Sequence, residues 1–127
     1  MTAYAAIWLL AALSVKHFVA DFLYQPPYQW KNKGTFGHPG GILHAGQHAV
    51  ATYFVLAFCP ISMLAAIAVC AAEFVIHYIT DWAKMDINTR YGWGANTHNE
   101  FWILLGIDQL IHSLTYVGIA LTVARIA

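Results

Sequence analysis

Long apolar stretches alternate with short polar segments along this chain. A bilayer core of about 30 Å is crossed by roughly 20 helical residues, and each stretch is close to that length. Proline ends a helix, and the first stretch stops at Pro26-Pro27 while the second stops before Pro60. We therefore predict an all-α integral membrane four-helix bundle. Its spans are expected at Ala3–Tyr24, Ile42–Phe58, Ile61–Ala83 and Phe101–Ala124.

The segments between the spans differ in length. Gln25–Gly41 is rich in glycine, proline and lysine. Lys84–Glu100 is polar and contains Gly92 and Gly94, so both segments are expected to be loops. The second and third spans are separated only by a few residues around Cys59-Pro60, which predicts a tight hairpin. No repeat or composition shift divides the chain, so residues 1–127 are expected to form a single membrane domain.

Four spans would place both termini on one side and both long loops on the other. Most basic residues lie on the loop side. That side contains Lys31, Lys33, Lys84 and Arg90, whereas the terminal side contains only Arg125. Cytoplasmic segments of membrane proteins carry the excess of lysine and arginine. The sequence thus predicts a multi-pass membrane protein with its long loops in the cytoplasm and its termini outside. Lys84 is interpreted as an interfacial anchor that reaches lipid phosphates.

Composition supports this class. Hydrophobic residues make up 60% of the chain and charged residues only 9%, whereas soluble domains average roughly 25% charged. The formal net charge is zero, which excludes a basic surface for nucleic acid. The expected partner is the lipid bilayer, and the sequence leaves open a homo-oligomer or a membrane-protein partner.

The polar residues inside the spans follow a helical spacing. Residues four apart lie on one face of a helix, and ionisable groups at membrane depth usually serve a site. In an antiparallel bundle, these groups fall within about 15 Å of the loop-side boundary. They should therefore converge in one leaflet. The groups are His17/Asp21, His44/His48, Glu73/His77/Asp81 and Asp108/His112.

Histidine with aspartate or glutamate is the ligand set of zinc, iron or manganese. The sequence therefore predicts a divalent metal site, mono- or dinuclear, with zinc as the first choice and iron as the second. Any surplus ligands would orient the imidazoles. The candidate ligands are His17, Asp21, His44, His48, His77, Asp81, Asp108 and His112.

Catalytic roles are assigned to two carboxylates. Asp108 and Glu73 are the candidates, with an aspartate acting as general base toward a metal-bound water. Lys16 introduces an alternative, because a buried ammonium needs a carboxylate partner and a Lys16–Glu73 pair would make Glu73 structural. His38 and His98, both in loops, are interpreted as solvated or interfacial residues.

Four motifs in order carry a resemblance to a known family. They are His17-Phe-Val-Ala-Asp21-Phe-Leu-Tyr-Gln25, the pair His44/His48, His77-Tyr-Ile-Thr-Asp81-Trp-Ala-Lys84, and Asp108-Gln109-Leu-Ile-His112. The chain resembles small bacterial and phage membrane proteins that share a domain of unknown function. This resemblance implies a polytopic membrane fold and no established activity. Glu73 and the Lys84–Glu100 segment depart from the commonest pattern.

The motif style is also loosely similar to that of membrane-bound metal-dependent hydrolases. The leading interpretation is an intramembrane metal site near the cytoplasmic face that hydrolyses a lipid-linked or membrane-proximal substrate. The alternative is a non-enzymatic accessory or interaction protein whose polar network holds its helices together. A proton or ion path is a third interpretation of the same groups.

Overall fold

A computed structural model describes the whole chain, residues 1–127. It is entirely helical, which confirms the predicted fold class. The predicted span limits agree with the helix limits within a few residues, except at the end of the third span. The elements are α1 (Ala3–Phe18), the π-helical turn η1 (Val19–Leu23), α2 (Pro27–Trp30), α3 (Pro39–Leu56), α4 (Met63–Tyr91) and α5 (Asn99–Ile126).

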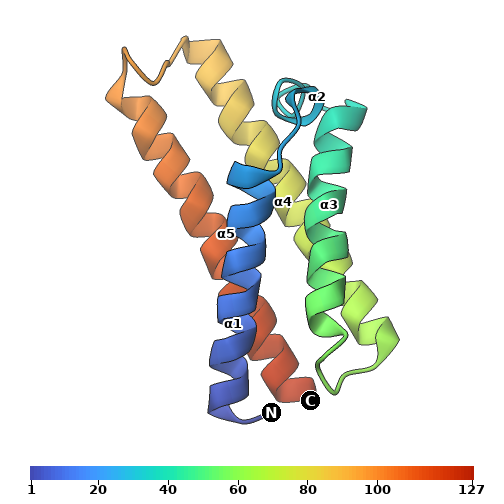
Figure 1. Ribbon diagram of the computed structural model, residues 1–127. Coiled ribbons are helices and arrows are strands. Elements are labelled where there is room, and N and C mark those ends of the chain that lie inside the picture. The colour runs from blue at the N-terminus through green and yellow to red at the C-terminus, as the bar shows by residue number, and fades with distance from the viewer.

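The four long helices run antiparallel to their chain neighbours (Figure 1). Both termini lie at one end of the bundle, and the short helix α2 lies at the other end. The tightest packing joins α3 to α4, while α1 contacts both α5 and α3. The sequence between α3 and α4 forms the expected turn through Cys59-Pro60. This arrangement brings the C-terminal half of α1 beside the N-terminal half of α3 and the middle of α5.

Three of these helices are long and apolar enough to cross a membrane. They are the continuous helix Ala3–Leu23, α4 and α5. Their outer faces expose large apolar side chains such as Trp8 and Leu114, which is the pattern of a lipid-facing surface. The chain is thus a multi-pass membrane protein. Helix α3 is not among the three, since glycines and polar residues occupy much of its N-terminal half. A fourth span at α3 stays a prediction.

The segment predicted as a loop from Lys84 to Glu100 is largely helical. Helix α4 continues eight residues past Ala83 and ends at Tyr91, where Gly92 adopts a left-handed φ of +66°. At 1.5 Å per residue its 29 residues span about 44 Å, more than a bilayer core requires. The prediction was wrong here because polarity ends a membrane span without ending a helix. An Asp86–Arg90 ion pair at 2.6 Å spans one turn of this extension.

The interior is divided into two layers. Apolar residues fill the terminal end, including Leu13, Leu56, Tyr116 and Val123. Buried histidines and carboxylates fill the interior toward the loop end. The polar layer is therefore sealed from the terminal side by a conventional apolar core.

Two glycines at the start of α3 allow the preceding segment to approach closely. A Cβ at Gly40 would lie 2.4 Å from the carbonyl oxygen of Tyr28, and one at Gly41 would lie 3.2 Å from Lys33 Cα. Residues 28–33 therefore lie directly against α3. This contact directs Lys33 into the bundle, where its exposed fraction is only 6%.

Candidate metal centre

Each long helix contributes residues of one i,i+4 face to a single buried cluster. The imidazoles of His44, His48, His77 and His112 are at most 2% exposed. Three of the rings stack in series, with centroids 3.8 Å apart for His48–His77 and 4.2 Å for His77–His112. The structure therefore brings together side chains from α3, α4 and α5 that are distant in sequence.

Asp21 reaches this cluster from a π-helical turn. The backbone N–H of Tyr24 donates to the carbonyl of Val19 at 2.7 Å, which is an i to i−5 hydrogen bond. Such single π turns are often found at functional sites. Chain direction changes immediately afterward at Pro26. The wide turn positions Asp21 at the junction of α1 and α3, where its carboxylate is only 5% exposed.

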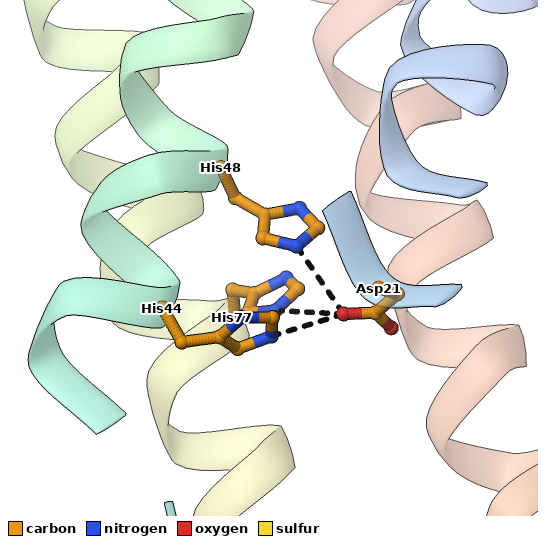
Figure 2. Close-up of side chains that lie close together, drawn as sticks. All are labelled: Asp21, His44, His48 and His77. Carbon is orange, nitrogen blue, oxygen red and sulfur yellow. Dashed lines mark hydrogen bonds and ion pairs between the residues drawn. The ribbon is translucent and has the colours of Figure 1, made fainter. Parts of the chain in front are cut away.

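One oxygen of Asp21 faces three imidazole nitrogens (Figure 2). The distances from Oδ1 are 3.0 Å to His44 Nε2, 3.2 Å to His48 Nε2 and 3.8 Å to His77 Nε2. The nitrogens of His44 and His77 are also 3.2 Å from each other. All four ligand atoms lie within 4.8 Å of one another, so this group can hold a metal ion. The side chains come from three different elements, η1, α3 and α4.

A second group adjoins the first and shares His77. Its members are His77, Asp81 and His112. The two carboxylate oxygens of Asp81 face different neighbours: Oδ2 lies 3.1 Å from His44 Nε2, while Oδ1 lies 3.4 Å from His112 Nε2. Asp81 therefore lies between the two groups. The predicted ligands His17 and Asp108 belong to neither group.

His17 interacts with the back of Asp21. Its Nε2 lies 3.3 Å from Asp21 Oδ2 and 3.1 Å from Gln109 Oε1. Its Nδ1 lies 2.9 Å from the hydroxyl of Tyr116. Both ring nitrogens thus have partners, and an Nε2–H that donates to these oxygens would orient the Asp21 carboxylate.

Glu73 belongs to neither group and pairs with Lys16. The Lys16 ammonium also donates to the Tyr116 hydroxyl at 3.2 Å and to the backbone carbonyl of His48 at 3.3 Å. The side chains of Lys16 and Glu73 are 7% and 1% exposed. This pairing supports the structural alternative for Glu73, whose expected catalytic role stays a prediction.

Two further lysines enter the cluster, which was not predicted from the sequence. Lys33 donates to Asp81 Oδ2 at 2.9 Å, and Lys84 donates to Asp108 Oδ2 at 2.9 Å. Lys84 is only 9% exposed, so its interpretation as an interfacial anchor was wrong. The helix continues through Lys84 and turns this residue, three positions after Asp81, toward the same interior. Four carboxylates thus meet three ammonium groups in the polar layer.

The two loop histidines lie outside the cluster, as expected. His38 precedes α3, and its Nδ1 accepts a hydrogen bond from the backbone of Gly40 at 3.0 Å. His98 precedes α5 and is exposed, with its Nδ1 2.8 Å from the hydroxyl of Thr97.

Helix bundle and polar layer together define a multi-pass membrane protein with a buried histidine–aspartate cluster that can hold a metal ion. The chain belongs to the family described as "Protein of unknown function (DUF3307)", which it matches over residues 9–127. That match confirms the expected relation to a family without an established function. No curated protein and no solved structure matches the chain.

Proposed function

We propose that the polar layer binds a divalent transition metal, with zinc as the first choice and iron as the second. The observation that carries this proposal is the approach of His44, His48 and His77 Nε2 to one oxygen of Asp21. Zinc–nitrogen and zinc–oxygen bonds of 2.0–2.2 Å in a tetrahedron put neighbouring ligand atoms about 3.3–3.5 Å apart. The distances among Asp21, His44 and His77 range from 3.0 to 3.8 Å and fit that spacing.

The unpaired atoms of the cluster support the same proposal. His77 Nδ1 is buried without a hydrogen-bond partner, while His77 Nε2 faces the Nε2 of His44. A neutral imidazole offers one N–H and one lone pair, so hydrogen bonding between these rings leaves His77 Nδ1 unsatisfied. An unsatisfied buried polar atom costs about 1–3 kcal/mol. A cation between the two Nε2 atoms would offset that cost with much stronger interactions.

Within this proposal the histidines take different roles. Lys16 Nζ lies 3.4 Å from His48 Nδ1, and an ammonium has no lone pair to offer. His48 Nδ1 therefore accepts, and its Nε2 carries the proton and lies 3.2 Å from Asp21 Oδ1. Asp21, His44 and His77 are then the three protein ligands, which leaves the open position that a catalytic metal site requires. His17 and His48 orient the Asp21 carboxylate from two sides. Asp81 and His112 remain available for a second metal.

We further propose that the centre hydrolyses a membrane-proximal substrate, with Asp108 as general base. A bound divalent metal polarises a substrate oxygen and lowers the pKa of a water. Asp108 accepts hydrogen bonds from Lys84 and Gln109 through Oδ2, whereas its buried Oδ1 accepts none. This oxygen, which lies 3.4 Å from His112 Nε2, is the one left to take a proton from water. An Asp108→Asn variant should retain the metal and lose turnover of bis-p-nitrophenyl phosphate or p-nitrophenyl acetate in micelles.

The metal content of the purified protein tests the proposed metal centre most directly. Protein purified in detergent without chelator should contain at least one equivalent of zinc or iron by elemental analysis. His77→Gln should lose the metal, His48→Gln should retain it because His48 is not one of the three ligands in this assignment, and the exposed His98→Gln is the matched control. Well under one equivalent in the wild type, with no rise in melting temperature on metal addition, would overturn the proposal.

The non-enzymatic alternative predicts a different result in the same experiment. A structural polar network loses stability in the His77 variant as well, so stability alone does not separate the two interpretations. Interhelical hydrogen bonds in membranes average only about 0.6 kcal/mol, which makes this many buried polar groups an expensive way to hold helices together. A metal-free wild type that is folded and unaffected by chelator would support the alternative.

A further inference from the structure

A cavity of about 240 Å³ opens beside the proposed metal centre toward the loop end of the bundle. It lies between η1, the segment after it, the C-terminal extension of α4 and the start of α5. Asp21 lies in its wall, so the cavity communicates directly with the carboxylate that faces His44, His48 and His77. Pockets for drug-sized ligands are larger, about 300–1,000 Å³, so this cavity suits one small group.

Two buried ammonium groups line this cavity. Lys33 and Lys84 both belong to its wall, with exposed fractions of 6% and 9%. Their present partners are Asp81 and Asp108, each at 2.9 Å. Gln109 and Asn88 also line the wall, and the Gln109 amide nitrogen donates to Asp108 Oδ2 at 2.9 Å. Two ammonium groups thus line a cavity that is next to a cluster of carboxylates.

The charge of the polar layer changes sign when a metal binds. With neutral imidazoles, the carboxylates of Asp21, Glu73, Asp81 and Asp108 exceed the three lysines by one negative charge. One divalent cation would convert this excess into one positive charge. A buried charge without a counterion is unfavourable, and a carboxylate drawn to the metal leaves its lysine with a weaker partner. An anion at the lysines would balance the charge of the loaded centre.

We infer that this cavity is the binding site for a phosphate group, held by Lys33 and Lys84 next to the metal. The inference rests on the proposed metal centre and names the substrate class of that site. Lysine is a common phosphate ligand as a point charge. Trp30 and Phe101 add an apolar wall, which suits the organic part of a phosphate ester. Free phosphate and a lipid phosphate present the same chemistry, and the cavity's place near the loop-side boundary makes both accessible.

Calorimetric titration tests this inference on the full chain in a nonionic detergent free of phosphate. Zinc content is measured first, and the zinc-loaded protein is then titrated with inorganic phosphate and, in a second arm, with dihexanoyl phosphatidate. Dihexanoyl glycerol is the matched neutral lipid. We expect phosphate or phosphatidate to bind the loaded protein, and binding to be lost after zinc removal. Binding of both identifies a general phosphate site, and binding of phosphatidate alone identifies a lipid headgroup site.

Lysine variants locate the site. Lys33→Gln or Lys84→Gln should retain zinc and bind the phosphate about 10- to 100-fold more weakly, the loss expected for one charge-assisted contact. Lys33→Arg should restore binding, and it keeps the test valid if a Gln variant fails to fold. The exposed Lys31→Gln is the control.

The two proposals fail in different ways. Zinc-loaded protein that binds neither phosphate nor phosphatidate overturns the inference and leaves the metal centre standing. Equal binding by the Lys33 and Lys84 variants and the wild type overturns it as well, because the phosphate would then bind elsewhere. Protein that takes up no zinc overturns both proposals.

Discussion

Replacement of the buried Lys16–Glu73 pair distinguishes a structural Glu73 from a catalytic one. The pair joins α1 to α4, and the two side chains are 7% and 1% exposed. Lys16→Met would leave the Glu73 carboxylate without its cation, and Glu73→Met would leave the ammonium without its anion. The double replacement removes both charges and fills the space with apolar atoms. We expect each single variant to be much less stable than the double variant.

The magnitudes follow from the burial and the contacts of the pair. Removing one partner of a buried ion pair costs about 3–5 kcal/mol, and a charge at the centre of a membrane helix costs about 2.5–3.5 kcal/mol. Each single variant should therefore lower the free energy of unfolding by about 3 kcal/mol. The double variant loses the hydrogen bonds of Lys16 to the Tyr116 hydroxyl, the His48 carbonyl and His48 Nδ1, about 0.6 kcal/mol each. It should be destabilised by less than about 2 kcal/mol.

Unfolding by sodium dodecyl sulfate, followed by circular dichroism in mixed micelles, measures these differences. Exposed Lys31→Met serves as the control and should leave the unfolding free energy within about 0.5 kcal/mol of wild type. Metal content is measured on every variant that folds, and a structural Glu73 predicts a full equivalent in the double variant. The reasoning is refuted if the double variant is as unstable as the sum of the singles. Loss of metal or turnover in a well-folded double variant would restore the catalytic role of Glu73.

The remaining predictions concern topology, packing and pH. In a background without native cysteines, Thr35→Cys and Asn96→Cys should resist an impermeant thiol reagent in intact cells, and ready labelling of both would reverse the orientation. Gly41→Ala should displace Lys33 from Asp81 and lower the melting temperature, whereas full retention of stability would show that the segment before α3 can move aside freely. Metal occupancy should fall as pH drops through roughly 6, because imidazole must be neutral to ligate, and dialysis at graded pH followed by elemental analysis measures this.

The i,i+4 spacing predicted the position of the polar layer because it is a local property of the helix. His44/His48, His77/Asp81 and Asp108/His112 each lie one turn apart, and all three pairs face the bundle interior. Because consecutive helices run antiparallel, a pair near the C-terminal end of one helix lies at the same depth as a pair near the N-terminal end of the next. Neither step depends on details of side-chain packing, so the sequence was sufficient for both.

The i,i+4 spacing could not show which of these residues approach one another closely enough to share a metal ion. The π-helical turn directs Asp21 toward α3. No residue pattern in Val19–Leu23 indicates that an i to i−5 hydrogen bond forms there. The distinction between Asp21 and His17, four residues earlier on the same helix, follows from this turn and from the partners Tyr116 and Gln109. Those partners come from α5, which is distant in sequence.

The interior positions of Lys33 and Lys84 could not be predicted from polarity alone. Lys33 and Lys84 were counted as basic residues that face the cytoplasm, yet each is paired with a buried aspartate. Lys33 reaches Asp81 because Gly41 lets the preceding segment lie against α3, and Lys84 is turned inward because α4 does not end where its apolar run ends. Without these two residues, the basic excess on the loop side narrows to Lys31 and Arg90 against Arg125. The orientation of the protein therefore depends on fewer exposed charges than the sequence indicates, which makes the labelling of Thr35 and Asn96 the decisive measurement of topology.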